Sequence, residues 1–364
     1  MSASGPAAVI ILAAGEGTRM KTPVPKMLNE VCGRAMLGYV IGAARELEPA
    51  SLIVVVGHGH GQVAEYLGSA APDARIVVQD RRGGTGHAVR TALEAVGTIH
   101  GTVVVIYSDT PLLRGSTLAE LVTGHAAAVT ALTAVTPDPA GYGRIVRDAS
   151  GAFAAIVEQA DASPEQQSIQ EINTGVYAFD GDLLADAIKR LPTDNAKGEE
   201  YLTDVAVIAR ADGYPVATIR CGDPDEVLGV NDQVQLASVR QIMNRRLLRG
   251  WLEAGVTVVD PASTWIDAGV TLEAGARIEP GTQLQGSTAV GAGAHVGPGC
   301  LLRDTAVAAG ATVIQSVCES AVVGAAASVG PFAYLTPGTR LAAGQRAVPG
   351  GFAPAPQPQG EQDQ

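Results

Sequence analysis

The chain has 364 residues, enough for two domains and a sizeable core, and its formal net charge is −12 at pH 7. An excess of 37 acidic over 25 basic residues excludes the basic face that a nucleic-acid-binding surface needs. No apolar run approaches the roughly 20 residues of a membrane span, and segment 1–6 does not resemble a signal peptide. The four cysteines are far apart, which argues against a disulfide framework or a metal site. The composition therefore predicts a reduced, cytoplasmic protein.

The most informative stretch follows an expected buried strand at Ala8–Ile11. It reads Leu12-Ala13-Ala14-Gly15-Glu16-Gly17-Thr18-Arg19-Met20 and is followed by Pro25-Lys26. Glycine lets backbone N–H groups approach an anion, Arg19 and Lys26 add two cations, and a helix after the turn would add its positive end. The stretch lacks the spacing of a dinucleotide fingerprint and the Gly-Lys-Ser/Thr of a P-loop. It favours polyphosphate binding, and the alternative is an ordinary glycine-rich turn with solvated cations.

Through residue 220 the pattern alternates strands with helices, which is typical of an α/β fold with a mostly parallel sheet. The expected strands are 8–11, 52–56, 74–79, 103–106, 129–134, 153–157, 173–179 and 216–220. The expected helices are 36–47, one from about residue 87, 182–191 and one within 197–210. Because ligands bind beyond the carboxyl ends of parallel strands, the loops after Ile11, Gln79 and Ile106 are expected to face one site. His58 and His60 lie two residues apart without a third ligand nearby, so this segment is interpreted as a strand-end turn rather than a metal site.

A long helix is expected at 234–252, with Asp232 as its N-cap. After it, aliphatic residues recur every six positions: Ile266, Leu272, Ile278, Leu284, Val290, Val296 and Leu302, then Val323, Val329, Leu335 and Leu341. This period predicts a parallel β-helix. The register slips between Leu302 and Val323, which predicts a loop there. The segment 348–364 is rich in proline, glutamine and acidic residues, and it is expected to be a disordered tail.

The glycine-rich stretch resembles the L-A-A-G-x-G-T-R-M…P-K signature of the sugar-1-phosphate nucleotidyltransferases. Further motifs follow in the family's order: Gly84-Thr85-Gly86-His87-Ala88, Asp109-Thr110-Pro111-Leu112, Tyr142-Gly143-Arg144-Ile145, Glu158-Gln159, Asn173-Thr174-Gly175-Val176-Tyr177, Tyr201-Leu202-Thr203-Asp204 and Gly229-Val230-Asn231. The ordered set most resembles the uridyltransferase half of the bifunctional N-acetylglucosamine-1-phosphate uridyltransferase / glucosamine-1-phosphate acetyltransferase family. This implies a Rossmann-like nucleotidyltransferase domain at 1–232, a connecting helix at 233–252, a short left-handed parallel β-helix at 253–347 and the tail at 348–364.

The resemblance also implies roles for individual residues. Arg19 and Lys26 would be the catalytic cations, and Asp109 with Asn231 would bind Mg²⁺, which prefers hard oxygen ligands. For Asp109 the alternative is an N-cap of a helix after Pro111. The implied substrate-binding residues are Leu12, Ala13, Ala14, Gly15, Gln79, Gly84, Thr85, Tyr107, Tyr142, Gly143, Glu158, Asn173 and Asn231.

The sequence departs from the family pattern in two places. The family's acetyltransferase site uses the arginine of L-R-P-G, whereas this chain reads Leu335-Thr336-Pro337-Gly338, and we expect the later coils of that site to be missing. A hydroxyl cannot replace a guanidinium that binds phosphate bidentately, so the acetyltransferase activity is expected to be lost. Ser108 replaces the family's glycine before the metal-binding aspartate.

We therefore expect an Mg²⁺-dependent enzyme that forms UDP-N-acetylglucosamine and pyrophosphate from UTP and N-acetylglucosamine-1-phosphate. One alternative is the same chemistry on another sugar or cyclitol phosphate or another base, and a second is a non-catalytic nucleotide-sugar-binding subunit. The resemblance implies a homotrimer, because the family packs three β-helices side by side, and small residues would let their flat faces approach closely. These residues are Ala306, Ala308, Ala309, Ala325, Ala326 and Ala327.

Overall fold

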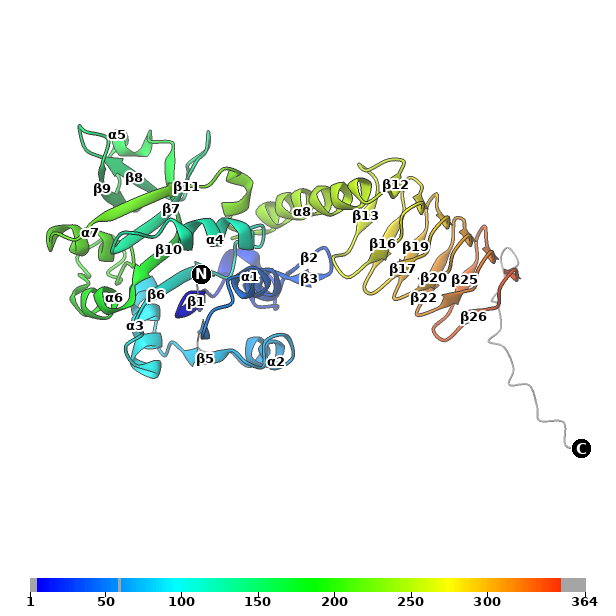
Figure 1. Cartoon of the computed structure of the whole chain (residues 1–364), viewed down its shortest axis with the longest axis horizontal. Coiled ribbons are helices and arrows are strands. Elements are labelled where there is room, and N and C mark those ends of the chain that lie inside the picture. The colour runs from blue at the N-terminus through cyan, green and yellow to red at the C-terminus, as the bar shows by residue number, and fades with distance from the viewer. Residues whose placement is uncertain (1–4, 58–59, 348–364) are drawn as a thin grey trace, which may run out of the picture. The chain divides into compact units, whose positions relative to one another are not determined.

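The computed structural model describes residues 5–57 and 60–347 (Figure 1). His58 and Gly59 of the expected strand-end turn, and the expected tail at 348–364, lie outside the described residues. The chain divides into two compact units, one of residues 1–29 with 35–239 and one of residues 30–34 with 240–364. The division falls inside helix α8 (Gln233–Glu253) and assigns most of the hairpin β2 (Glu30–Val31) and β3 (Arg34–Ala35) to the second unit. The boundaries expected from the sequence stay a prediction.

A twisted sheet forms the centre of the first unit, with strand order β11-β7-β10-β6-β1-β4-β5. Its strands are β1 (Ala8–Ala13), β4 (Leu52–Val56), β5 (Arg75–Val78), β6 (Thr102–Tyr107), β7 (Val129–Val135), β10 (Glu171–Asp180) and β11 (Val216–Arg220). β1 pairs in parallel with β4 and β6, whereas β10 runs antiparallel between β6 and β7. The hairpin β8 (Gly143–Arg147) and β9 (Phe153–Val157) joins the sheet through β10. The Rossmann-like sheet predicted from the sequence is confirmed.

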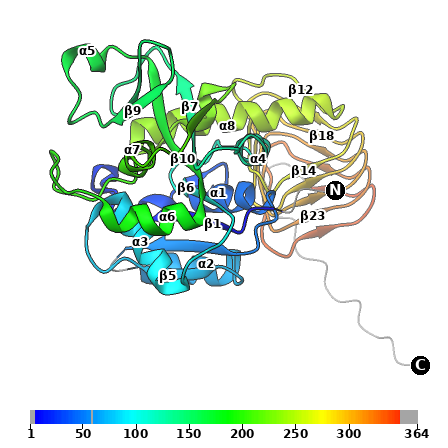
Figure 2. The same ribbon diagram turned by 60° about the vertical axis from the view of Figure 1, so that its left-hand side comes forward.

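Helices cover both faces of this sheet (Figure 2). One face packs against α1 (Met36–Arg45), α2 (Gly61–Ala70) and α4 (Gly115–Thr123). The other face packs against α3 (Gly84–Val96), α6 (Gly181–Ala187) and α7 (Asp204–Ala211). Burial on both faces explains why β1 is apolar at every position rather than alternating. The remaining short helices are α5 (Pro164–Gln167) and the 3₁₀ turns η1 (Thr18–Met20), η2 (Lys26–Leu28), η3 (Ile188–Arg190) and η4 (Pro224–Val227).

Three helix predictions differ from the structure. The prediction of a helix directly after the glycine-rich turn is wrong, because the turn is followed there only by the 3₁₀ turns η1 and η2. The helix expected from about residue 87 begins at Gly84. Within 197–210 only α7 is helical, because the backbone of Glu200 pairs with Gly83 and Gly86 instead of forming a helix. By contrast, the long helix is confirmed, and Asp232 accepts from the Gln235 backbone N–H at 2.8 Å as its N-cap.

A bulge in β10 brings its backbone close to Tyr107. The pairing of β10 with β7 shifts between Asn173 and Tyr177, and Gly175 between them has φ of +80°. A Cβ at Gly175 would overlap the Tyr107 ring, so only glycine fits there. The Asn173 side-chain oxygen Oδ1 accepts from the Gly175 backbone N–H at 3.3 Å and from the Tyr177 hydroxyl at 2.7 Å.

The second unit confirms the predicted parallel β-helix. Its strands stack in three parallel sheets, with orders β12-β15-β18-β21-β24-β27, β13-β16-β19-β22-β25 and β14-β17-β20-β23-β26. Their bounds are β12 (Thr257–Val258), β13 (Trp265–Ile266), β14 (Thr271–Leu272), β15 (Arg277–Ile278), β16 (Gln283–Gln285), β17 (Ala289–Val290), β18 (His295–Val296), β19 (Leu301–Arg303), β20 (Ala306–Val307), β21 (Thr312–Val313), β22 (Val317–Glu319), β23 (Val322–Val323), β24 (Ser328–Val329), β25 (Tyr334–Leu335), β26 (Arg340–Leu341) and β27 (Arg346–Ala347). The aliphatic residues of the six-residue period fill its interior.

The loop expected between Leu302 and Val323 is wrong. Strands β19 to β23 continue the stack, and the buried residues Leu302, Val307, Val313, Cys318 and Val323 continue the interior column. Three of these steps are one residue shorter than a hexad. Each shortened corner turns at a residue in the left-handed conformation, with φ of 48° at Asp304, 41° at Gln315 and 44° at Ser320. A shorter corner, not an inserted loop, causes the register slip.

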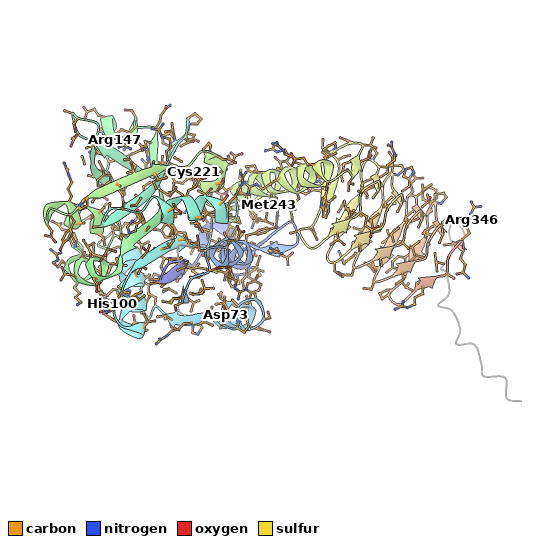
Figure 3. All side chains as sticks on the ribbon, viewed as in Figure 1. Asp73, His100, Arg147, Cys221, Met243 and Arg346 are labelled. Atoms are coloured by element: carbon orange, nitrogen blue, oxygen red, sulfur yellow. The ribbon has the colours of Figure 1, made fainter. Side chains whose placement is uncertain are left out.

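Cys32, Cys221, Cys300 and Cys318 are buried free thiols, as the sequence predicts (Figure 3 labels Cys221). Burial raises the pKa of the Cys32 and Cys318 thiols to about 12, so both stay protonated and act as packing residues. Within residues 5–57 and 60–347, no helix is long and apolar enough to cross a membrane.

We predict that Gly175→Ala destabilises the first unit and lowers activity, because the new methyl overlaps Tyr107. The strained backbone alone costs about 1–3 kcal/mol, and the overlap adds to it. Gly213→Ala is the matched control, since Gly213 has φ of +82° and no atom lies within 4 Å of the position that a methyl group would take there. Denaturant unfolding and initial rates are the measurements. Equal losses of stability in the two variants would contradict the overlap.

Candidate active site

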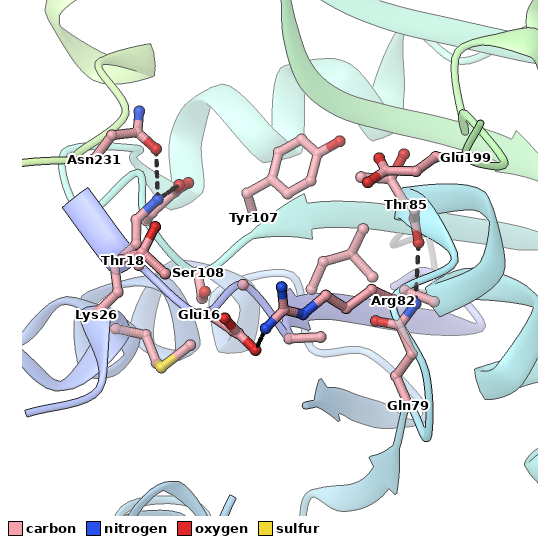
Figure 4. Close-up of a pocket in the computed structure, with 18 of the residues that line it drawn as sticks. Glu16, Thr18, Lys26, Gln79, Arg82, Thr85, Tyr107, Ser108, Glu199 and Asn231 are labelled. Atoms are coloured by element: carbon pink, nitrogen blue, oxygen red, sulfur yellow. Dashed lines mark hydrogen bonds and ion pairs between the residues drawn. The ribbon is translucent and has the colours of Figure 1, made fainter. Parts of the chain in front are cut away.

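A cavity of about 510 Å³ opens at the carboxyl ends of β1, β5 and β6 (Figure 4). It is lined by Leu12, Ala14, Gly15, Glu16, Gly17, Thr18, Lys26, Met27, Gln79, Arg82, Gly84, Thr85, Ala88, Tyr107, Ser108, Asp109, Lys197, Glu199 and Asn231. The loops after these three strands therefore meet at one site, as the sequence predicts.

Lys26 lies between two oxygen atoms from distant loops. Its Nζ is 2.5 Å from Asp109 Oδ2 and 2.8 Å from Asn231 Oδ1, and its side chain is 11% exposed. The Val230 backbone N–H donates to the Asp109 carbonyl at 2.9 Å, which ties the two loops together. Asp109 does not cap a helix, because α4 begins at Gly115 with Arg114 at its N-cap position. The alternative role weighed for Asp109 is therefore excluded.

Charged residues other than Lys26 and Asp109 also line the cavity. Arg82 forms an ion pair with Glu16 of the glycine-rich turn. Lys197 is exposed and, within the described part of the chain, its Nζ has no hydrogen-bonding partner. Lys197 is thus a cation that an anionic ligand can engage without breaking a contact.

Gln79 is fixed at the far end of the cavity and is only 8% exposed. Its Nε2 donates to the Gly84 carbonyl at 3.1 Å and lies 2.8 Å from His87 Nδ1. Burial, followed by the charges of Arg81 and Arg90, lowers the pKa of His87, so the ring is neutral and Nδ1 can accept. The Gln79 carbonyl oxygen has no partner among residues 5–57 and 60–347, which leaves one acceptor for a ligand.

A second cluster forms on β8, β9 and β10. Gly143 pairs with Asn173, and Arg144 pairs with Val157, so the antiparallel register brings Glu158 alongside Gly143. Burial raises the pKa of the Glu158 carboxyl, and the charge of Lys197 opposes that rise.

Tyr107 connects this cluster with the cavity. Burial raises the pKa of the Tyr107 hydroxyl, and the charges of Glu158 and Asp109 raise it further. Tyr107 lines the cavity, and β10 of the second cluster approaches its ring at Gly175, so the ring borders both.

Ten of the residues predicted from the sequence line the cavity: Leu12, Ala14, Gly15, Lys26, Gln79, Gly84, Thr85, Tyr107, Asp109 and Asn231. The predicted residues that do not line it are Ala13, Arg19, Tyr142, Gly143, Glu158 and Asn173. Arg19 is exposed on η1, and its side chain has no hydrogen bond or ion pair with the residues that the structure describes. Tyr142 accepts from the Gly229 backbone N–H at 3.3 Å through its hydroxyl oxygen.

The sequence did not assign four charged lining residues to the site: Glu16, Arg82, Lys197 and Glu199. Glu16 lies inside the recognised glycine motif, which was a signal for it. Lys197 and Glu199 lie in the segment expected to be helical, and the extended pairing of Glu200 that places them at the cavity is non-local.

The cavity offers cations, backbone N–H groups and hard oxygen ligands, with an amide acceptor at one end. These groups suit a reaction in which the protein positions phosphates and stabilises charge instead of supplying a nucleophile. The fold and the site together define a nucleotidyltransferase.

Comparisons with known proteins agree with this class. Residues 9–176 match the family model described as MobA-like NTP transferase domain. The chain is 55% identical over 346 residues to the bifunctional protein GlmU of Streptomyces coelicolor, covering 94% of this chain and 72% of that protein. It is 58% identical over 348 residues to the GlmU of Streptomyces avermitilis, with 94% and 72% covered. Against the GlmU of Thermobifida fusca it is 55% identical over 331 residues, with 89% and 68% covered.

The chain belongs to the GlmU family, and it is a sugar-1-phosphate nucleotidyltransferase.

We predict that Glu158→Gln stabilises the protein at pH 8 and that this gain disappears in acid. A carboxyl whose folded pKa is raised above 4.5 is destabilising when ionised, and the penalty vanishes below pH 4.5, where both states are protonated. Melting temperatures between pH 4 and pH 8 measure it. Glu165→Gln, at an exposed position of α5, is the control and is expected to change the melting temperature little. A gain that is constant across pH would contradict the burial of Glu158.

Proposed function

We propose that this protein transfers the uridylyl group of UTP to N-acetylglucosamine-1-phosphate and forms UDP-N-acetylglucosamine and pyrophosphate. The observation that carries the proposal is the convergence of Asp109 and Asn231 on the Lys26 ammonium inside the cavity. In the reaction a phosphate oxygen of the sugar phosphate attacks the α-phosphorus of UTP in line. The bond from this phosphorus to the bridging oxygen breaks, and pyrophosphate leaves with that oxygen.

The glycine-rich turn and Lys26 are proposed to bind the triphosphate. Gly17 has φ of +63°, and a Cβ there would overlap Lys26 Cβ, so glycine lets the lysine approach the turn. Lys26 and the exposed Lys197 would neutralise charge on the phosphates as it redistributes. A catalytic role for Arg19 stays a prediction, because its side chain is exposed on η1.

Asp109 and Asn231 fit a divalent ion. A carboxylate and an amide oxygen, the hard ligands that Mg²⁺ prefers, already converge on one cation, the Lys26 ammonium. Among the residues described, no group of three or more histidine, cysteine, aspartate or glutamate side chains could hold a metal. We therefore propose that these two residues hold Mg²⁺ and that phosphates and water complete its coordination. The ion would supply charge neutralisation on the phosphates.

Gln79 is proposed to select the base. Its amide N–H₂ is already engaged by Gly84 and His87, so its carbonyl oxygen remains to accept a hydrogen bond. Uracil presents an N3–H donor, whereas the N3 of cytosine is an acceptor. This difference favours UTP over CTP.

The Glu158 cluster is proposed to bind the sugar. The Glu158 carboxylate would accept from sugar hydroxyls, with the Gly143 backbone and the Asn173 amide as neighbouring polar groups. Because the Glu158 cluster lies beside Tyr107, a sugar bound there would be next to the nucleotide cavity.

Pyrophosphate release with each NTP and a panel of sugar and cyclitol phosphates tests the proposed activity. We expect the highest kcat/KM with UTP and N-acetylglucosamine-1-phosphate. A higher value with another pair would assign the enzyme to that substrate instead. No release with any pair would favour a non-catalytic subunit.

We predict that Asp109→Ala lowers kcat at least about 100-fold, because it removes a metal ligand and leaves the Lys26 ammonium without its carboxylate partner. Asp73→Ala is the control, since Asp73 forms an exposed ion pair with Arg45 (Figure 3). Initial rates at saturating Mg²⁺ are the measurement. A variant that retains the rate of the unmodified enzyme would remove Asp109 from the site.

The loss of acetyltransferase activity also stays a prediction. Thr336 stands where the family pattern has arginine, and its hydroxyl lies 3.3 Å from the Thr339 hydroxyl. A hydroxyl pair has no cationic fork for a phosphate. We expect no release of coenzyme A from acetyl-CoA and glucosamine-1-phosphate.

A homotrimer formed through the β-helix, in the cytoplasm, is the proposed state of the protein. A shallow cavity of about 410 Å³ lies on the sheet β14-β17-β20-β23-β26 and is lined mostly by small residues, including Ala306, Ala308 and Ala309. Ala325 and Ala326 are exposed, whereas Ala327 points into the interior and is 1% exposed. The small exposed side chains would let a second copy approach this face closely.

We predict that Ala306→Arg dissociates the trimer, because it places a long charged side chain on the flat face. Light scattering of the full chain gives the mass. Thr257→Arg, on the sheet that begins with β12, is the control and should leave the mass unchanged. A monomeric unmodified protein would contradict the proposed assembly.

A further inference from the structure

Ser108 is a largely buried residue in the wall of the cavity. It follows β6 directly, precedes Asp109 and is 5% exposed. Its backbone N–H donates to the Leu12 carbonyl at 3.1 Å, which fixes it against the start of the glycine-rich turn. This backbone hydrogen bond to β1 therefore fixes the position of the Ser108 Cβ.

The Ser108 hydroxyl has no hydrogen-bonding partner within residues 5–57 and 60–347. The buried Tyr201 hydroxyl is also unpaired among the described residues, whereas several buried threonine hydroxyls of the first unit are paired. Thr110 donates to the Tyr107 carbonyl at 3.2 Å, Thr133 to the Glu171 carboxylate at 2.9 Å and Thr174 to the Leu132 carbonyl at 2.7 Å. A hydroxyl that lines the cavity and has no protein partner is free to pair with a ligand there.

The two ends of the cavity restrict which part of a ligand Ser108 can meet. Gln79 and Thr85 lie at one end, and Lys26 with Asn231 lies at the other, and Figure 4 shows Ser108 between them. With the base at Gln79 and the phosphates at Lys26, as in the proposed function, the ribose occupies the stretch between. The ribose carries the hydroxyls that a serine hydroxyl can pair with as donor or acceptor.

We infer that Ser108 Oγ hydrogen-bonds to a ribose hydroxyl of the bound nucleotide and makes the enzyme select UTP over the analogue that lacks this hydroxyl. The inference rests on the proposed function for the orientation of the nucleotide. Ser108 is a specificity-determining residue. An analogue without this hydroxyl loses the bond and leaves the serine hydroxyl without a partner in the complex.

The contact acts on binding and not on the bonds that form and break. The ribose does not change its charge during transfer, so the hydrogen bond is equally strong in the ground state and the transition state. Uniform binding of this kind changes KM and leaves kcat unaltered. This distinguishes Ser108 from Asp109, whose loss lowers kcat.

The test compares UTP, 2′-deoxy-UTP and 3′-deoxy-UTP in the full-length enzyme and in Ser108→Ala. In the unmodified enzyme, one of the two analogues should show a KM about 3- to 10-fold higher than that of UTP, with kcat retained. In Ser108→Ala the KM for UTP should rise to the value for that analogue, and the analogue itself should be unaffected. The two analogues identify which ribose hydroxyl is bound.

Two further variants control for packing. Ser108→Gly also lacks the hydroxyl and should lose the same discrimination, so an effect of the alanine methyl is excluded if the two agree. Thr18→Val removes another cavity hydroxyl, on η1, and should change the binding of all three nucleotides by a common factor. Circular dichroism confirms folding of each variant.

Calorimetric binding of the same three nucleotides separates this inference from the proposed function. Discrimination that persists in both Ser108 variants, or an unmodified enzyme that binds all three equally, would overturn the role of Ser108. An unmodified enzyme that discriminates in binding but forms no UDP-sugar would overturn only the proposed function.

Discussion

The ammonium of Lys26 links three loops that lie far apart in the sequence: its own loop and the loops that carry Asp109 and Asn231. Its contacts to Asp109 and Asn231 span 83 and 205 residues. A largely buried cation of this kind needs both oxygen partners, because an unpaired charge in this position would carry a desolvation penalty. Two features bring these loops together at the carboxyl edge of the sheet. β1 and β6 pair in parallel, so they end side by side, and the Val230 N–H donates to the Asp109 carbonyl. The site is thus a product of sheet register as much as of its motifs.

The sequence predicted the elements whose signals are local. Strand β4 and strand β11 match their expected bounds, since β-branched residues between turns are a local signal for a strand. Helix α2 has no expected counterpart, because the sequence around His58 and His60 was interpreted only as a turn. The helix expected within 197–210 is α7, but it begins only at Asp204, because Glu200 pairs with the Gly83–Gly86 loop far earlier in the chain. No local pattern contains that partner.

The residues of the candidate site also divide into those with a local sequence signal and those placed by distant pairing. Lys26, Asp109 and Gln79 stand in recognisable motifs at strand ends, and the structure brings them to one cavity. Arg82 and Lys197 reach it through loops whose course depends on tertiary pairing, so neither residue type nor spacing indicated them. The Glu158 cluster is adjacent to the cavity through Tyr107. This arrangement depends on Gly175, which lets β10 approach the Tyr107 ring.

The shortened corners at Asp304, Gln315 and Ser320 have an evolutionary consequence. In a hairpin, losing one residue from a strand turns every following side chain to the opposite face. In the β-helix each strand is only two or three residues long and re-pairs with the coil before it, so a deletion at a corner is absorbed within that corner. The column from Leu302 to Val323 stays in place although three of its steps are one residue shorter than a hexad. Domains of this kind can therefore accept single-residue deletions at corners without a compensating insertion, and alignments that assume a strict six-residue repeat will misplace their later coils.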